Sequence, residues 1–183
     1  MKDCIVKALP ISKTNLKLQL SNAKAFLRYS KLVHREITKY HKIYKLDNTY
    51  QLCDGFTAIL LEDMIDGLEL SQEKYDYLDV RLLVNNCKNE LCDYEKIDID
   101  MELLKQYANI AKKLECVKFE NTFNLKNSYF NPIYLLRAIH ILGTENVTIY
   151  VHNSSYLKPA YLKSSLGEAI VLPIVPPKEL RKY

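Results

Sequence analysis

The chain has 183 residues, of which 48% are hydrophobic and 26% are charged, and its formal net charge is +4. This length is enough to bury a hydrophobic core, as one domain or as two small ones. No apolar run approaches the roughly eighteen residues that a membrane span needs. Because the first residues are too polar for a signal peptide, we expect a cytoplasmic protein without a membrane partner.

The five cysteines indicate reduced thiols rather than a disulfide framework, because they are scattered and odd in number. Cys87 and Cys92 lie close together in the sequence, but no second pair of cysteines or histidines follows at zinc-ligand spacing. We therefore expect neither a metal site nor another cofactor.

The N-terminal part of the chain predicts a strand, a helix and three further strands. Alternating apolar and polar residues favour a strand at residues 16–20, and Ser21 or Asn22 can cap a helix over about residues 22–36. The next three strands are predicted at residues 39–46, 49–53 and 56–61.

This predicted helix carries a stripe of like charges. Its members are Lys24, Arg28, Lys31 and Arg35, with Lys39 just beyond the helix. A charge run is usually a solvated helix face, but positive charges at these spacings repel one another, and Glu36 is the only acidic residue nearby. Phosphates of a nucleic-acid backbone would supply the missing countercharge. The stripe therefore predicts contact with double-stranded DNA.

The central part of the chain predicts a less regular segment. Residues 62–75 resemble a polar connection and an internal boundary, and Asp100 can cap a helix over residues 101–114. The other predicted elements are a strand at 77–84, a loop at 85–96 and a strand pair at 116–120 and 122–125.

Residues 128–176 predict a helix followed by three strands. Asn131 suits the N-cap position and Pro132 the first helical position, where its missing N–H costs nothing. Gly143 suits the end of this helix. Residues 147–151 alternate as a strand, and residues 169–172 form another that Pro173 ends.

This segment resembles the C-terminal end of bacterial DNA sliding clamps, the beta subunits of DNA polymerase III. In that family Phe-Asn introduces a helix with a Tyr-Leu-Leu-x-Ala core, strands follow, and an apolar tail containing proline ends the chain. The matching residues are Phe130, Asn131, Tyr134, Leu135, Leu136, Ala138, Leu142, Val147, Ile149 and the run 170–174.

A second point of resemblance is a strand–Asp-Gly–aromatic–strand signature at Asp54, Gly55 and Phe56. Here Cys53 stands where the family commonly has threonine, and Thr57 stands where it has arginine. The second difference removes a positive charge that the family carries at this position.

The resemblance implies an α+β fold of sliding-clamp-like repeats, each a strand, a helix and three strands, with the helices on one face of curved antiparallel sheets. The pattern fits residues 16–61 and again residues 122–175. We therefore expect an N-terminal clamp-like unit at 1–68 and a C-terminal unit at 69–183, with a degenerate or inserted segment at about 76–121. Bacterial clamps have three full domains per chain, which 183 residues cannot supply. A closed ring would therefore require a homo-oligomer.

The resemblance also implies a non-catalytic processivity factor of DNA replication. In the family, C-terminal residues help to form a hydrophobic groove for short peptide motifs of DNA polymerases and clamp loaders. The corresponding residues here are Tyr156, Leu157, Pro159, Leu172, Pro173 and Ile174. Residues 177–183 continue past the family's usual end and could cover or extend the groove.

Two other functions remain open from the sequence. One is a clamp-fold module that binds proteins without encircling DNA. The other is a metal-dependent nucleic-acid enzyme that uses Asp98 and Asp100, although Asp100 is also explained as a helix cap. The chain lacks a phosphate-binding loop and the Gly-x-Ser-x-Gly and His-Glu-x-x-His motifs, so we expect no enzymatic activity.

Overall fold

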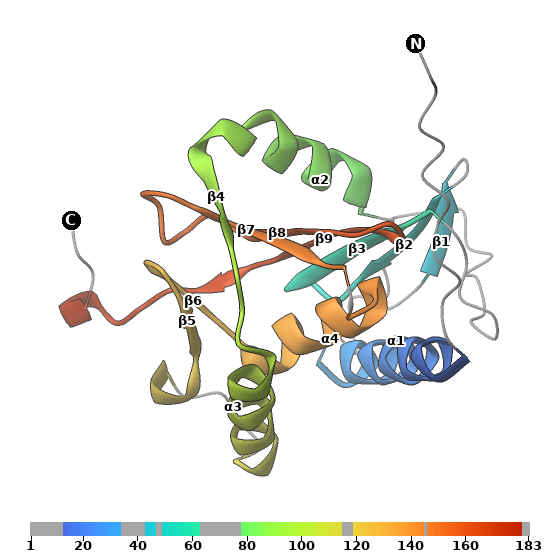
Figure 1. The fold of residues 1–183 in the computed structure, drawn as a ribbon, viewed down its shortest axis with the longest axis horizontal. Helices are drawn as coiled ribbons and strands as arrows, with labels where there is room; N and C mark the ends of the chain where they lie inside the picture. Colours follow the sequence, from blue (N-terminus) through green and yellow to red (C-terminus); the bar gives the residue numbers. More distant parts are fainter. Residues whose placement is uncertain are drawn as a thin grey trace.

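The computed structural model describes residues 13–33, 43–46, 49–62, 78–114, 119–144 and 146–180. In this part of the chain the fold is α+β, with two antiparallel sheets, as the sequence predicts. The helices are α1 (Lys13–Val33), α2 (Val80–Asn89), α3 (Met101–Lys113) and α4 (Pro132–Leu142). In Figure 1 the larger sheet is seen nearly edge-on, with α2 on one side and the other three helices on the opposite side.

The larger sheet has seven strands in the order β1-β2-β3-β9-β8-β7-β4. In this order the strands are β1 (Ile43–Leu46), β2 (Thr49–Cys53), β3 (Thr57–Leu61), β9 (Gly167–Val171), β8 (Ala160–Lys163), β7 (Thr148–His152) and β4 (Tyr94–Ile97). The smaller sheet has three strands, in the order β10 (Pro173–Ile174), β6 (Ser128–Phe130) and β5 (Phe123–Leu125).

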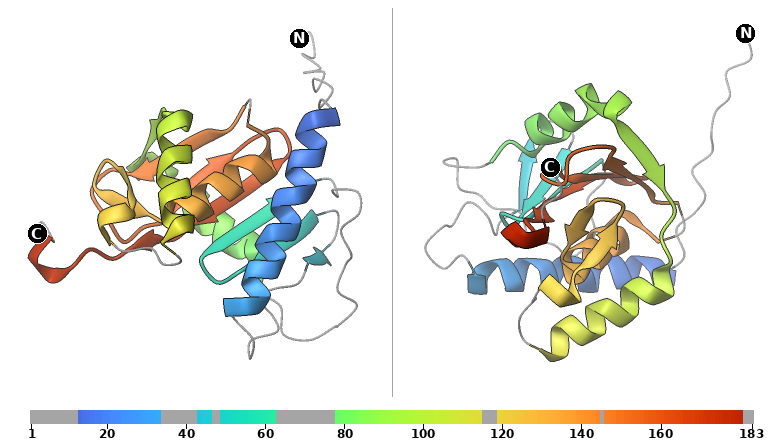
Figure 2. Two further views of the ribbon diagram at one scale, coloured as in Figure 1. Left: turned by 90° about the horizontal axis from the view of Figure 1, so that it is seen from below. Right: turned by 90° about the vertical axis from the view of Figure 1, so that its left-hand side faces the viewer.

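Two halves of the larger sheet have the same element order. The first is α1-β1-β2-β3 and the second is α4-β7-β8-β9. They meet where β3 and β9 pair antiparallel, from Thr57 opposite Val171 to Leu61 opposite Gly167. Figure 2 shows α1 and α4 on the same face of the sheet, so the two halves share both their element order and the side that their helix covers.

The hydrophobic core lies on both faces of the larger sheet. All five residues of β3 are buried, which agrees with the almost continuous apolar sequence of this strand. On one face Ile59 packs in a cluster with Phe26 of α1 and Leu135 of α4. On the other face Val84 of α2 packs in a second cluster with the strands.

Side-chain caps set the beginnings of α3 and α4, and both were predicted. A side-chain oxygen of Asp100 accepts hydrogen bonds from the backbone N–H groups of Glu102 and Leu103, at 2.9 and 3.0 Å. The Asn131 side chain accepts one from the N–H of Ile133 at 2.9 Å, and Pro132 occupies the first turn. The predicted strands 49–53 and 147–151 are also confirmed within about one residue.

The strand predicted at residues 16–20 is wrong, because these residues belong to α1. Alternation of apolar and polar residues over only five positions does not distinguish a strand from a helix. In a helix, one of the five residues can face the core while the others do not. Here that residue is Gln19, which is 2% exposed and donates a hydrogen bond from Nε2 to the backbone oxygen of Ile141 at 3.2 Å. Leu16 and Leu18 are exposed instead.

The strand predicted at 77–84 and the loop predicted at 85–96 are also wrong. Residues 80–89 form α2, and β4 follows at 94–97. Val80, Val84 and Cys87, which are spaced four and three apart, form the buried side of α2. Asp79 caps this helix by accepting a hydrogen bond from the N–H of Leu82.

The strand predicted at 122–125 is confirmed as β5, but the strand predicted beside it at 116–120 is wrong where the structure describes it. Residues 119–121 form a 3-10 turn, and β5 pairs with β6 instead. Residues 115–118, together with 63–77 of the predicted connection, lie outside the described residues.

Candidate nucleic-acid interface and apolar pocket

A line of polar residues runs along the side of α1 that faces away from the sheet. Its members are Lys17, Ser21, Lys24 and Arg28, all exposed and spaced four, three and four apart. The buried residues Gln19, Ala23 and Phe26 each lie two positions further on. Two residues correspond to about 200° around a helix, so the exposed line points away from the core.

The positive charges of α1 are not balanced within the helix. The helix contains no aspartate or glutamate. Among the described residues, no salt bridge involves Lys17, Lys24 or Arg28. Nearby like charges without a counterion repel one another, and a bound polyanion would relieve that repulsion.

Of the other three predicted DNA-binding residues, the structure describes only the backbone of one. Lys31 lies within α1 by its backbone, although its side chain is outside what the structure describes. Arg35 and Lys39 lie outside the described residues.

Two further helices extend the positive surface of α1. Figure 2 (left) shows α1, α4 and α3 side by side in front of the sheet, with α4 in the middle. Arg137 and His140 lie half-buried on α4. Together with Lys17, Lys24 and Arg28 of α1 and Lys105, Lys112 and Lys113 of α3, they form what we call the basic helical face.

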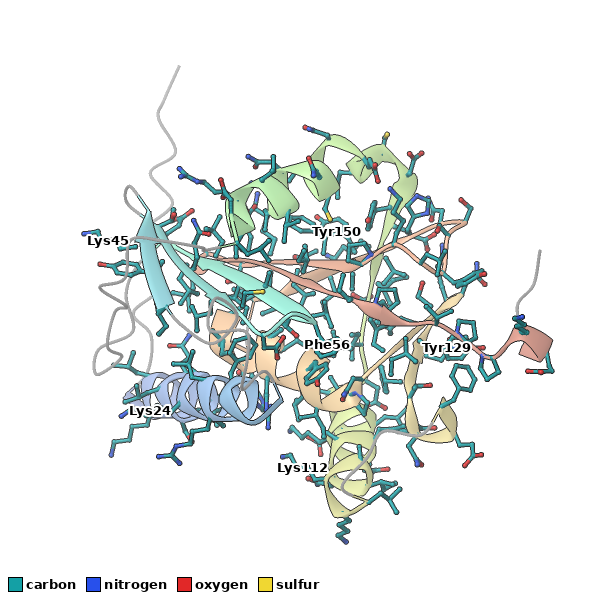
Figure 3. The ribbon with its side chains drawn as sticks, turned by 180° about the vertical axis from the view of Figure 1, so that it is seen from behind. Lys24, Lys45, Phe56, Lys112, Tyr129 and Tyr150 are labelled. Atoms are coloured by element: carbon teal, nitrogen blue, oxygen red, sulfur yellow. The ribbon has the colours of Figure 1, made fainter. Side chains whose placement is uncertain are left out.

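The basic helical face contains little opposing charge. The three helices have one acidic residue among them, Glu102, which pairs with Lys105 at 2.5 Å. In Figure 3, Lys24 and Lys112 both lie on the side of the helices away from the larger sheet. The sequence did not predict the contribution of α3, because its position beside α4 depends on packing between distant segments.

The pKa of His140 is lowered by burial and by positive charges of this face. Burial lowers the pKa of its imidazole from the usual 6.5, and the positive charges of Lys105 and Lys112 on α3 lower it further. The unfolded chain therefore binds a proton at His140 more readily than the folded chain does.

We expect this difference to make folding depend on pH. The stability that neutral His140 provides should be complete above about pH 6.5 and should decrease as the pH falls below it. Urea unfolding of the wild type and of His140→Gln at several pH values tests this. The free-energy difference between the two proteins should shift in favour of the variant as the pH falls, whereas a constant difference would contradict the assignment.

An apolar pocket of about 430 Å³ lies on the opposite face of the sheet, beside α2. It is lined by Leu83, Asn86, Cys87, Asn89, Glu90, Tyr94, Lys158, Pro159, Ile170 and Leu172. At its rim Lys158 pairs with Glu90 at 2.5 Å. A pocket with this lining can hold an apolar side chain, while the charged pair and the two asparagines offer polar contacts at its edge.

The residues predicted to bind partners occupy three different places. Pro159 and Leu172 line the pocket. Tyr156 and Leu157 lie between β7 and β8, and Leu157 is 56% exposed. Pro173 and Ile174 form β10, which pairs with Phe130 and Tyr129 of β6. Residues 178–180 are not among those that line the pocket.

Burial affects two titratable groups of the pocket, Cys87 and Tyr94. Burial raises the pKa of the Cys87 thiol, which therefore stays protonated at neutral pH and is a poor nucleophile. Burial also raises the pKa of the neighbouring Tyr94 hydroxyl, and Cys87 adds to this effect. Elsewhere, one carboxylate oxygen of Asp100 already caps α3.

The described residues hold neither a metal-binding cluster nor a membrane-spanning helix. They contain no group of three or more histidine, cysteine, aspartate or glutamate side chains arranged to hold a metal ion. No helix in this part of the chain has the length and apolar character required to cross a membrane.

Comparisons of the chain with protein-family models, with curated proteins and with solved structures found no match.

Proposed function

We propose that this chain is a non-catalytic, sliding-clamp-like factor that associates with duplex DNA through the basic helical face. The observation that carries the proposal is the charge of that face: three adjacent helices with a single acidic residue among them, facing away from the sheet. The resemblance to bacterial clamps in residues 128–176 and the repeated halves of the larger sheet support the same conclusion.

The dimensions of α1 suit a DNA backbone. Lys17 and Arg28 are eleven residues apart, which is about 16 Å along a helix. Phosphates of one strand recur about every 3.4 Å along the duplex axis, so this length covers roughly five of them. Contacts to phosphates carry no sequence information, so binding of this helix to the backbone should not depend on sequence.

The experiment is a fluorescence-anisotropy titration of the wild-type chain with two duplexes of equal length and unrelated sequence. We expect equal affinities that weaken steeply as salt is added. Absence of binding at low salt would contradict the proposal.

Encirclement of DNA would require several copies, because the described part of one chain supplies two repeated halves. We therefore propose a homo-oligomer on DNA, which the mass of the protein–DNA complex in solution would test. A complex with a single chain per binding site would contradict encirclement while leaving DNA contact intact.

The apolar pocket is the proposed docking site for peptide motifs of a DNA polymerase or a clamp loader. Buried apolar anchors supply most of the free energy of such peptide contacts. Pro159 and Leu172, which the clamp resemblance implies for partner binding, both line it.

Leu172 and Leu157 offer a matched test of this site. Both are exposed leucines, but only Leu172 lines the pocket. Leu172→Asp should weaken binding of polymerase-derived peptides by at least about tenfold, because it places a charge in an apolar contact. Leu157→Asp should bind as the wild type does in the same anisotropy assay. Equal losses in both variants would contradict docking in this pocket.

The second candidate function is a protein-interaction module that does not bind DNA, and the apolar pocket is the observation that favours it. The two functions separate experimentally. Peptide binding that depends on Leu172, combined with no affinity for duplex DNA at low salt, would favour the interaction module.

A further inference from the structure

Helix α3 has an apolar side that the described fold covers only at Tyr107. Leu104, Ala108 and Ala111 form its buried side. About a quarter turn away runs a second line spaced four, three and four apart, which we call the apolar stripe: Leu103 (42% exposed), Tyr107 (partly buried), Ile110 (47%) and Leu114 (47%). The Tyr107 ring also meets the Phe123 ring edge-on, at 5.7 Å between centroids.

A polar line with the same spacing runs beside the apolar stripe. Its members are Glu102, Gln106, Asn109 and Lys113, all exposed. The line begins with a negative charge and ends with a positive one, and its two middle members are amides that can donate and accept hydrogen bonds.

We propose that two copies of the chain associate through α3, with the two helices antiparallel across a two-fold axis. In a two-fold interface, if residue i contacts residue j, then j also contacts i. A register centred between residues 108 and 109 places Leu103 against the partner's Leu114, and Tyr107 against the partner's Ile110. The apolar stripe is therefore complementary to itself.

The polar line is complementary to itself in nearly the same register. Glu102 lies near the partner's Lys113, and Gln106 lies near the partner's Asn109. The antiparallel arrangement also places the N-terminus of each helix beside the C-terminus of the other, which their dipoles favour.

The other flank of α3 excludes a contact on that side. In the same register Lys105 would face the partner's Lys112, and these like charges repel. Both lysines belong to the basic helical face, so contact through the apolar stripe leaves them available for a polyanion, while Lys113 of that face takes part in the contact.

The size of α3 determines how strong this association can be. Thirteen residues make a helix about 20 Å long. A pair of such helices buries less than the roughly 1,200 Å² that stable specific interfaces bury at minimum. We therefore expect a monomer–dimer equilibrium with a dissociation constant in the micromolar range or weaker.

The proposal is tested by sedimentation velocity over a concentration series, without DNA. The wild type should convert from monomer to dimer as its concentration rises. Ile110→Glu should remain monomeric, while the control Lys163→Glu, in β8 on the larger sheet, should dimerise as the wild type does. A wild type that stays monomeric at its highest soluble concentration, or an Ile110→Glu variant that still dimerises, would overturn the proposal.

Charge exchange tests the antiparallel register. Glu102→Lys and Lys113→Glu should each weaken the dimer about tenfold, because like charges then face each other twice. An equimolar mixture of the two variants should recover a heterodimer, in which both contacts again join opposite charges. Circular dichroism checks that each variant is folded. A mixture no more dimeric than its components contradicts the two-fold register. Because the assay contains no DNA, a negative result would contradict the α3 dimer without bearing on the proposed DNA contact.

Discussion

Replacing Lys24 and Arg28 together with glutamate should weaken binding to duplex DNA about a hundredfold at low salt. Both side chains are exposed on the side of α1 away from the core, and neither has an ion pair among the described residues. The variant loses two phosphate contacts and gains two repulsive charges. The slope of log affinity against log salt should therefore become shallower by about two.

A matched control separates this local effect from the change in total charge. Lys163→Glu combined with Lys178→Glu alters the net charge by the same amount, and both residues are exposed outside the helices of the basic helical face. We expect the control to bind nearly as the wild type does. Equal weakening in the two double variants would show that only net charge matters and would contradict a DNA contact at α1.

Replacing Gly167 with alanine should destabilise the fold by about 3 kcal/mol or more. This residue pairs with Leu61 where β9 meets β3, and its φ is +152°. A Cβ atom there would lie 2.1 Å from the backbone oxygen of Leu60. The two strands would have to separate at the point where the repeated halves join.

Thermal unfolding measures this effect. For a chain of this length a loss of about 3 kcal/mol corresponds to a decrease in Tm of roughly 6 to 12 °C. Ser165→Ala, in the exposed turn before β9, serves as the control and should change stability by less than about 0.5 kcal/mol. A Gly167→Ala variant as stable as this control would contradict the close pairing of β3 with β9.

The elements that the sequence predicted correctly are those determined by local chemistry. Asp100 and Asn131 are caps whose side chains bond to the next few backbone N–H groups, so neighbouring residues were enough to locate α3 and α4. The strands on either side of Asp54 and Gly55 were found because their apolar runs are bounded by a turn signal.

The errors arose where a short pattern fits both a strand and a helix. Apolar and polar residues alternate loosely in 16–20 and 77–84, which fits a strand as well as a helix. Tertiary packing decides that Gln19 and Val84 are buried residues of α1 and α2. A strand at residues 16–20 would also separate Lys17 from the helix that carries Lys24 and Arg28.

The composition of the candidate sites could be predicted only in part for a related reason. Lys24 and Arg28 share a helix, so spacing alone placed them on one face. Lys105 and Lys112 join them only because α3 packs beside α4, which no local pattern indicates. The apolar pocket likewise combines α2 with the ends of β8 and β9, and α2 was predicted as a strand and a loop.

Lysine footprinting with and without duplex DNA tests the central claim most directly, because it reports which surface the DNA covers. The chain is acetylated in both states, and mass spectrometry compares the modification of each lysine. We predict protection of Lys17, Lys24, Lys112 and Lys113 on the basic helical face, and unchanged modification of Lys163 and Lys178. Protection confined to the latter two, or equal protection of all six, would contradict DNA binding through this face.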